Sequence, residues 1–235
     1  MHLLIILSFL ASSLLAYNEV VCQQIRQDDD EAQKQILSIL EKDPNHTQCV
    51  LKLANINLKK GFVIKGFELV ARAYSLDPHA VKKDALSKVL PSALKVTQLM
   101  KQAKQNGDNE SWNKVGNILF EIGIFKEAAK AYEVSLNKKE EQGKERLMYA
   151  LSLQNSGQKY RAIGEYKKLL TISKDNFLAN YYLGKLLRHE IYDEGEASKY
   201  LKKAYDLLHA KKEVNGSEFQ KYNSDLIDEL GNVLN

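Results

Sequence analysis

The sequence predicts an all-α protein built from antiparallel helix pairs stacked on one another. Two observations lead to this prediction. Helix-breaking residues are scarce, with 3 Pro and 12 Gly in 235 residues, while 44% of the residues are hydrophobic. Matching residues also recur at a spacing of 34, as from Pro44 to Pro78 and from Gly123 to Gly157. A fixed period of this length is typical of repeat proteins, in which each helix pair buries its apolar face against its neighbours.

The first sixteen residues are predicted to form an export signal. Residues 3–16 read LLIILSFLASSLLA, an uncharged apolar run that is short for a bilayer-spanning helix, which needs about 20 such residues. Ala16 supplies a small residue for cleavage, although no Lys or Arg precedes the run. A cleaved signal and a short uncleaved anchor both remain open. The expected location is the periplasm or cell envelope, with a secretory-pathway lumen or membrane anchoring as the alternatives.

Export would place Cys22 and Cys49 in an oxidising space, where they are candidates for a disulfide. Such a bridge would close a loop of about 28 residues and stabilise the fold by a few kcal/mol in the chain-entropy model. The alternative, two separately buried thiols, fits the sequence equally well. No metal site is predicted, because the cysteines and the five His show no ligand spacing.

Four stretches of the chain align with one another at a period of 34 residues: 47–80, 109–142, 143–176 and, with one inserted residue, 177–211. The eighth place of each holds a small residue: Ala54, Gly116, Ala150 and Gly184. A second small residue stands near the twentieth place, and a large apolar residue follows four positions later. Small residues let two helices approach closely, while large ones fill the gaps beside them. Gly61, Gly123 and Gly157 are predicted to end the first helix of a pair in the left-handed conformation.

This pattern resembles the tetratricopeptide repeat (TPR) family. The best match is 109–142, where the signature places of that family are held by Trp112, Gly116, Gly123, Phe125, Ala128 and Tyr132. The resemblance implies a right-handed superhelical solenoid whose first helices line a concave groove. Residues 17–46 are predicted to be a degenerate N-terminal half repeat, and 81–108 a degenerate helix pair split at Pro91.

Residues 217–234 are predicted to form a helix that caps the last repeat. Its apolar residues follow one another with helical spacing along one face: Phe219, Tyr222, Leu226, Leu230 and Val233. The acidic residues Asp225, Asp228 and Glu229 lie off that stripe. A stacked array needs an end helix that covers the last repeat with its apolar face and exposes its other face to solvent. The alternative is that this helix docks on a partner.

The resemblance also implies which residues contact a partner. In that family they stand at the second, fifth, sixth, ninth, twelfth and thirteenth places of each first helix. The candidate groove residues at these places are Asn55, Lys59, Asn113, Asn117, Phe120, Leu147, Met148, Leu151, Tyr181, Tyr182, Lys185 and Arg188. The same places also hold Gln48, Leu51, Lys52, Leu58, Glu110, Lys114, Glu121, Lys144, Gln154, Asn155, Leu178 and His189.

Two features of this candidate groove are chemically informative. Asn55 and Asn117 stand at the ninth place, where a side-chain amide can bond both polar groups of a ligand backbone, although Asn is also an ordinary exposed helix residue. An unusually apolar stretch of the groove would be formed by Leu147, Met148, Leu151, Tyr181 and Tyr182. Such a stretch is either an interaction site or covered by another part of the chain. The remaining alternative is an error in the alignment of the repeats, by which residues of the core are assigned to the groove.

No catalytic motif supports an enzyme. The chain has no H-E-x-x-H, no G-x-S-x-G, no P-loop and no dinucleotide fingerprint, and no cofactor is expected. The balance of 34 Lys+Arg against 30 Asp+Glu is too even for a dedicated nucleic-acid binder.

The predicted function is therefore that of a non-catalytic scaffold that binds a protein or peptide partner in its groove. The expected setting is a cell-envelope assembly of the pilus, secretion or motility type. Two alternatives remain open, a structural adaptor that uses its convex and end surfaces and a regulatory subunit of an envelope enzyme. Membrane contact is expected only through residues 3–16, if that segment stays uncleaved.

Overall fold

Every regular element in the described part of the chain is a helix, which confirms the predicted all-α fold. The structure is a computed structural model that describes residues 22, 25, 30–139, 143–210 and 216–231. The predicted export signal at 1–16 lies outside these residues. None of the described helices is long and apolar enough to cross a membrane. The chain divides between Gln102 and Ala103 into two compact units, called unit 1 and unit 2.

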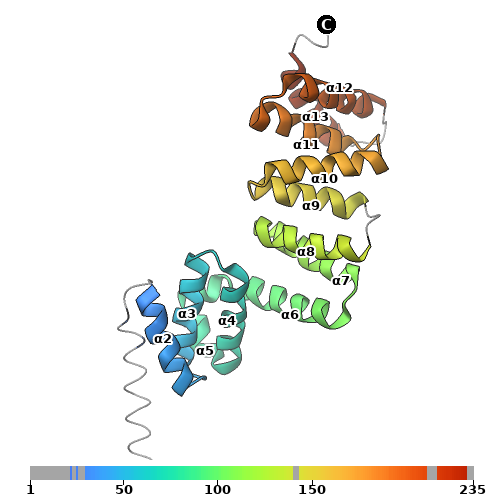
Figure 1. Cartoon of the computed structure of the whole chain (residues 1–235). Helices are drawn as coiled ribbons and strands as arrows, with labels where there is room; N and C mark the ends of the chain where they lie inside the picture. The colour runs from blue at the N-terminus through green and yellow to red at the C-terminus, as the bar shows by residue number, and fades with distance from the viewer. Residues whose placement is uncertain (1–21, 23–24, 26–29, 140–142, 211–215, 232–235) are drawn as a thin grey trace, which may run out of the picture. The chain divides into compact units, whose positions relative to one another are not determined.

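Unit 1 is organised around helix α3. Its elements are α2 (Asp30–Lys42), α3 (Thr47–Lys59), α4 (Val63–Leu76), α5 (Pro78–Lys83), the 3-10 helix η1 (Ala85–Lys88) and most of α6 (Leu90–Asn106) (Figure 1). The turn between α3 and α4 contains Gly61 with a φ of 78°, the left-handed conformation that the sequence predicts there. Ile36 of α2 packs against Leu53 and Ile56 of α3 in one buried cluster.

The segment after α4 departs from the predicted helix pair. The carboxylate of Asp77 accepts hydrogen bonds from the backbone N–H groups of His79 and Ala80, and this cap starts the short helix α5 at Pro78. Asp84 caps η1 in the same way through the N–H of Leu86, at 2.8 Å. A break does lie at Val89, between η1 and α6 and two residues before Pro91. The two Asp caps mark further breaks, so the segment holds three helical elements and not a pair. Pro91 is the second residue of α6, where a missing N–H costs no helical hydrogen bond.

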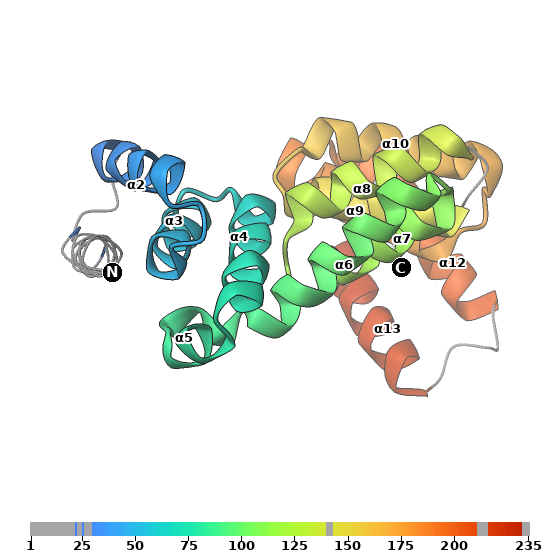
Figure 2. The same cartoon turned by 90° about the horizontal axis from the view of Figure 1, so that it is seen from below.

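The described part of unit 2 contains three helix pairs, a π-helical turn and, after them, one further helix. The pairs are α7 (Asn109–Glu121) with α8 (Phe125–Lys138), α9 (Gly143–Asn155) with α10 (Lys159–Ile172), and α11 (Phe177–Leu186) with α12 (Glu194–Ala210). The last helix is α13 (Gly216–Leu230). Helices α7 to α10 lie in successive layers (Figure 1) and overlap one another when seen from below (Figure 2). Gly123 and Gly157 end α7 and α9 with φ values of 78° and 80°, as predicted.

The small residue of one helix faces the large residue of its partner helix. A Cβ atom at Gly116 would lie 2.7 Å from the ring of Tyr132, and one at Gly184 would lie 2.6 Å from Leu201. Both distances are too short for real atoms, so these two places require glycine as long as the large side chains stay where they are. Tyr132 and Leu201 are fully buried. This complementarity sets the close spacing of the helices in each pair.

The inserted residue of the last repeat is absorbed by a π-helical turn. Helix α11 passes directly into this turn, η2 (Leu187–Ile191), which ends at Tyr192 with a left-handed φ of 63°. A π turn accommodates one residue more than the α-helical pattern and is frequent at functional sites. Here the turn carries Arg188 and His189, the twelfth and thirteenth residues of the repeat.

Candidate partner-binding surfaces

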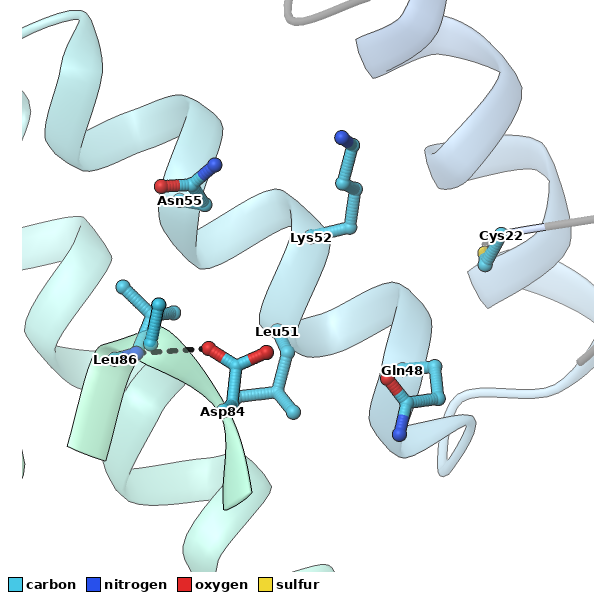
Figure 3. Close-up of a pocket in the computed structure, with 8 residues that line it drawn as sticks. Cys22, Gln48, Leu51, Lys52, Asn55, Asp84 and Leu86 are labelled. Carbon is cyan, nitrogen blue, oxygen red and sulfur yellow. Dashed lines mark hydrogen bonds between the residues drawn. The ribbon is translucent and has the colours of Figure 1, made fainter. Parts of the chain in front are cut away.

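One face of α3 opens onto a pocket in unit 1. The pocket has a volume of about 250 Å³, and α3 lines it with Gln48, Leu51, Lys52 and Asn55 (Figure 3). These residues are spaced by three, one and three positions, which places them on one helix face. The other lining residues are Cys22, Asp84, Ala85 and Leu86. The capped turn between α5 and η1 thus supplies the second wall of this pocket.

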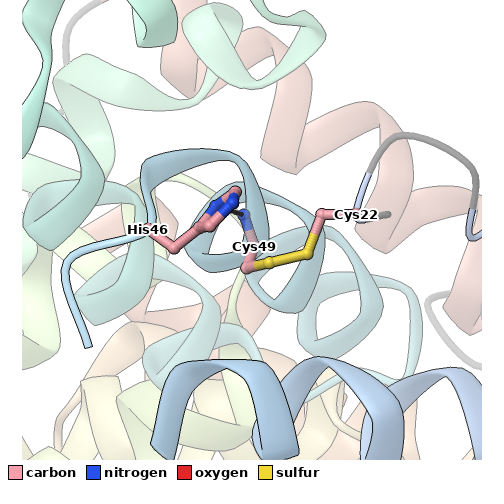
Figure 4. The surroundings of a disulfide bond; sticks show 3 residues. All are labelled: Cys22, His46 and Cys49. Atoms are coloured by element: carbon pink, nitrogen blue, oxygen red, sulfur yellow. Dashed lines mark hydrogen bonds between the residues drawn. A yellow bond between two sulfur atoms is a disulfide. The ribbon is translucent and has the colours of Figure 1, made fainter. Parts of the chain in front are cut away.

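Two contacts near the start of α3 hold this face in position. Cys22 and Cys49 form a disulfide with a Cα–Cα distance of 5.5 Å, and both residues are buried (Figure 4). The imidazole of His46 accepts a hydrogen bond from the N–H of Cys49 through Nδ1, at 3.3 Å, and so caps the helix. The disulfide ties Cys22 to the same helix turn that presents Gln48 and Leu51 to the pocket.

The Cys22, His46 and Cys49 ligand atoms lie within 4.8 Å of one another, a spacing that fits a metal ion. Thiolate sulfur is the form of cysteine that binds metals, and the disulfide uses both sulfur atoms. As the structure stands, this cluster is a structural crosslink with a helix cap beside it.

The pocket combines groups that suit a peptide. Leu51 is a buried apolar side chain, Lys52 is cationic, and Gln48 and Asn55 carry amides with both donor and acceptor atoms. All four stand at places where the resemblance implies partner contact, and all four line the pocket. Lys59, one helical turn further, is exposed on the same helix, outside the lining residues.

The predicted groove residues of α7 and α9 are largely occupied by internal contacts. Asn113 and Leu147 are buried. Asn117 is exposed, but its Oδ1 accepts a hydrogen bond from the Tyr132 hydroxyl at 2.7 Å. Phe120 packs edge-on against Phe125, with 5.2 Å between the ring centroids. Met148 and Leu151 are half-buried, and neither lines a pocket described here.

A second cavity, of about 340 Å³, lies among α8, α9 and α10. Its wall contains the buried Arg146, which pairs with Glu165 at 2.5 Å. Beside it, Glu133 accepts hydrogen bonds from Arg161 at 2.7 Å and from the Tyr149 hydroxyl at 2.9 Å. Lys168 also lines the cavity and pairs with Glu165 at 2.8 Å, so three cations face two carboxylates in this network. No predicted groove residue lines this cavity.

The predicted groove residues of the last repeat meet helix α13. The Tyr181 hydroxyl donates a hydrogen bond to Asp225 Oδ2 at 2.8 Å, and Lys185 Nζ contacts both oxygens of the same carboxylate at 2.8 and 3.0 Å. Glu229 lies one turn further along α13 and pairs with Lys185 at 3.4 Å. Tyr181 and Tyr222 pack edge-to-face with centroids 5.0 Å apart. The aromatic part of the predicted apolar stretch is thus covered by another part of the chain.

Two residues of the π turn extend this contact. Arg188 donates through one guanidinium nitrogen to the backbone carbonyl of Glu229 and pairs with its carboxylate at 3.5 Å. His189 Nε2 lies 2.7 Å from the other carboxylate oxygen of Glu229. Arg188 also pairs with Glu194 at 3.0 Å. Asp225 and Glu229 together therefore face Lys185, Arg188 and His189.

The pKa directions agree with this arrangement. Burial alone would lower the pKa of Lys185, but its hydrogen bond to Asp225 and the negative charges of Asp225 and Glu229 raise it above its ordinary value. Burial alone would raise the pKa of Asp225, yet hydrogen bonds from Lys185 and Tyr181 hold it below its ordinary value. Burial raises the pKa of Tyr222 to about 12. The pair therefore stays charged, and the tyrosines neutral, across the physiological range.

The helix spacing decides the fold type. Helices α7, α9 and α11 begin at Asn109, Gly143 and Phe177, each 34 residues after the last, and α8 and α10 begin 34 apart at Phe125 and Lys159. A left-handed glycine separates the two helices of a pair, and a small residue of one helix packs against a large residue of the other. These are the features that the TPR resemblance of the sequence implies. The chain has a TPR-like fold.

Comparisons with known proteins gave matches only among solved structures. No family model and no curated protein matches the chain. A crystal structure of MamA is 20% identical and covers 79% of this chain and 91% of that one, with a TM-score of 0.43. A crystal structure of YrrB, described as a TPR protein with an unusual peptide-binding site, is 16% identical over 79% of this chain and 100% of that one, with a TM-score of 0.41.

A third structure is MamA 41-end from Desulfovibrio magneticus RS-1. It is 12% identical, covers 85% of this chain and 96% of that one, and has a TM-score of 0.42. Likeness at this level carries no argument about what this chain binds or which residues bind it.

Sequence reasoning on the TPR-like repeats missed three carboxylates. Asp84 lines the unit 1 pocket from a turn that was expected to be helical. Asp225 and Glu229 were placed on the wet side of the cap helix, whereas they face the cations of α11 and η2. Their spacing of four residues was a usable signal, because it puts two acids on one helix face next to the apolar stripe.

Proposed function

We propose that this protein is a non-catalytic interaction scaffold that binds a segment of a partner protein at the α3 face of unit 1. The observation that carries the proposal is the pocket lined by Gln48, Leu51, Lys52 and Asn55. It opens on the helix face that the repeat resemblance assigns to partner contact, and the disulfide holds that face rigid.

The chemistry of the pocket supports an extended peptide with an acidic group. The amides of Gln48 and Asn55, seven residues apart, each offer an NH₂ group as donor and a carbonyl oxygen as acceptor, which suits the polar groups of a peptide backbone. Lys52 lies between them and attracts an acidic side chain or a carboxyl terminus. Leu51 provides apolar surface for a neighbouring side chain. We expect the fixed wall formed by Asp84 to disfavour a second acidic group nearby.

We further propose that the mature chain begins at Tyr17 and acts in the cell envelope. The support for this proposal is the apolar run at 3–16 and the disulfide, since such bonds persist mainly in oxidising compartments. Mass spectrometry of the natively expressed protein from fractionated cells tests it. A soluble envelope form with Tyr17 as its first residue is expected, and a membrane-bound form that retains Met1 would show that the segment is an anchor.

The binding proposal is tested by the double variant Lys52→Ala with Asn55→Ala. Proteins captured by the tagged native chain are quantified by mass spectrometry, and the strongest is then expressed and titrated against purified chains. Its affinity is expected to fall roughly tenfold or more in the variant, because two direct contacts are lost.

The matched control is Lys65→Ala with Glu68→Ala, two exposed positions on α4 of the same unit. This control is expected to bind like the native chain. Equal affinity for all three chains would show that the partner does not use the α3 face.

A further inference from the structure

The contact between α13 and the last repeat is more polar than closing a helix stack requires. Leu226 and Leu230 of α13 are fully buried, in one cluster with Leu201, Ala204 and Leu208 of α12. These apolar contacts alone would cover the end of the repeat. Yet α13 also directs Asp225 and Glu229 at Lys185, Arg188 and His189, which belong to α11 and its π turn.

Without α13, the cations on the face of α11 and η2 lose the carboxylates that pair with them. In the described part of the chain, every ion pair of Lys185 is made to α13, at 2.8 Å to Asp225 and 3.4 Å to Glu229. Arg188 has a second acidic partner in Glu194, whereas the ion pair of His189 also goes to Glu229. A helix that covers these cations must also supply carboxylates, because an ammonium group buried without one is costly. On α13 two carboxylates four residues apart do so.

Helix α13 is held by few apolar side chains. Of its 15 described residues, two are buried, whereas the 14-residue helix α8 buries six and the 17-residue helix α12 buries five. Ile227, beside the buried Leu226, is exposed. Phe219 and Tyr222 of α13 pack against the same cluster but are only partly buried. The two leucines anchor the helix and the ion pairs add to that anchor, so another helix that offers both sets of contacts can replace it.

We propose that the face formed by α11 and η2 is a helix-binding site, that α13 occupies it as a built-in ligand, and that an acidic amphipathic helix of a partner protein displaces α13. The partner helix carries an aromatic residue, an acidic residue three positions later and another four beyond it, as Tyr222, Asp225 and Glu229 do. Two leucines follow the acids by one position each, as Leu226 and Leu230 do. The proposal rests on the scaffold function and names the partner class for a second surface.

The test uses the full chain and a synthetic helix. The probe is a fluorescent peptide of residues 216–231 with blocked ends, titrated by anisotropy against three chains: the native one, Asp225→Asn with Glu229→Gln, and Asp228→Asn. The double variant keeps Leu226 and Leu230, and unchanged far-ultraviolet circular dichroism confirms that it is folded. Asp228 is exposed on the same helix, so its variant matches the chemistry of the change without touching the contact.

The peptide is expected to bind the double variant roughly tenfold or more tightly than the native chain or the Asp228→Asn chain. In those two chains the tethered α13 competes at an effective concentration near millimolar. A peptide that carries the same two substitutions is expected to lose this binding, and so is the double variant when Lys185→Gln is added. Equal binding to all three chains, or no binding to the double variant, would overturn the proposal.

One further chain separates this proposal from the α3 site. The peptide is expected to bind a chain with Lys52→Ala, Asn55→Ala, Asp225→Asn and Glu229→Gln as tightly as it binds the double variant. Loss of binding in this fourfold variant would place the peptide in the unit 1 pocket, which would overturn the inference about α11 and leave the α3 site standing. If the fourfold variant still binds the peptide, and the α3 changes do not affect the natural partner, the inference about α11 stands and the α3 site is overturned.

Discussion

The faces of α3 and α11 occupy the same places in their repeats, but one is open and the other is covered. On α3 these places hold Leu51 and Asn55, and the face opens onto a pocket. On α11 they hold Tyr181 and Lys185, and the face is covered by α13. A small polar amide tolerates water, whereas a large aromatic ring and a partly buried ammonium group need both apolar cover and a carboxylate. The side chains at equivalent places thus decide whether a helix face stays open.

The two units also stabilise these faces by different means. In unit 1 a disulfide joins Cys22 to Cys49 near the start of α3. In unit 2 no covalent link is involved, and α13 is held by two buried leucines and a group of ion pairs. The first arrangement is permanent in oxidising conditions, and the second is reversible. Four predictions separate the two.

Loss of the disulfide is expected to have the largest effect. In a chain with Cys22→Ser and Cys49→Ser, unit 1 is expected to lose about 3–4 kcal/mol of stability, the loop-closure value for a separation of this length. Amide hydrogen exchange should show faster exchange in α3, while α12 in unit 2 keeps its protection. A uniform loss of protection in both helices would show that the crosslink stabilises the chain as a whole.

Removal of a leucine anchor is expected to have the next largest effect, in unit 2. Leu226→Ala deletes a fully buried side chain, which costs about 2–5 kcal/mol at well-packed sites. Hydrogen exchange in α13 should accelerate, and exchange in α3 should not change. Ile227→Ala, at a position that is 44% exposed on the same helix, is the control and should cost less than about 0.5 kcal/mol. Similar costs for both variants would mean that α13 is not anchored through Leu226.

Acid is expected to loosen α13 and to leave the α3 face intact. The pKa of Asp225 is lowered in the folded chain, so its contribution to stability is complete above about pH 4 and is lost as the pH falls from there through the lowered pKa. The effect is modest because Asp225 remains about one-third exposed. Exchange rates in α13, corrected for the intrinsic effect of pH, report it. The Asp225→Asn chain should lack this acid-dependent step, and a step of equal size in that chain would contradict the assignment.

The smallest effect concerns two asparagines at the ninth place of their repeats. Asn117 accepts a hydrogen bond from Tyr132, so Asn117→Ala is expected to cost about 1 kcal/mol in chemical denaturation. A double-mutant cycle with Tyr132→Phe should return this value as the coupling energy. Asn55 lines a pocket, and Asn55→Ala should leave stability within about 0.5 kcal/mol. A reversed order would mean that the amide of Asn55, not that of Asn117, is structural.

The regular part of the fold was predictable because each repeat is specified locally. Gly123 and Gly157 mark the turns, and Gly116 and Tyr132 mark the close contact between helices, so the 34-residue spacing carries the helix register. The irregular segment after α4 was predicted less well, because Pro91 signals only the last of its breaks, at Val89. The Asp residues before Pro78 and Ala85 are helix-capping signals, and they mark the other two.

The α13 contact was predictable only in part. The sequence indicated an end helix with an apolar stripe, and it left open that the aromatic stretch near Tyr181 is covered by the chain itself. The partners of Asp225 could not be inferred, because Lys185 lies 40 residues away and the contact depends on how α13 is rotated about its axis. Such a rotation is set by the packing of Leu226 and Leu230, which a linear pattern does not contain.

The π turn at 187–191 has a consequence for how this chain can change in evolution. One extra residue in an α-helix rotates everything after it by about 100°. Here the added residue is absorbed within a single widened turn, so α11 before it and α12 after it each keep their packing surfaces. The turn carries Arg188 and His189, which both contact Glu229 of α13, and Arg188 also pairs with Glu194 at the start of α12. Substitutions at these two positions would therefore change which acidic helix the last repeat binds.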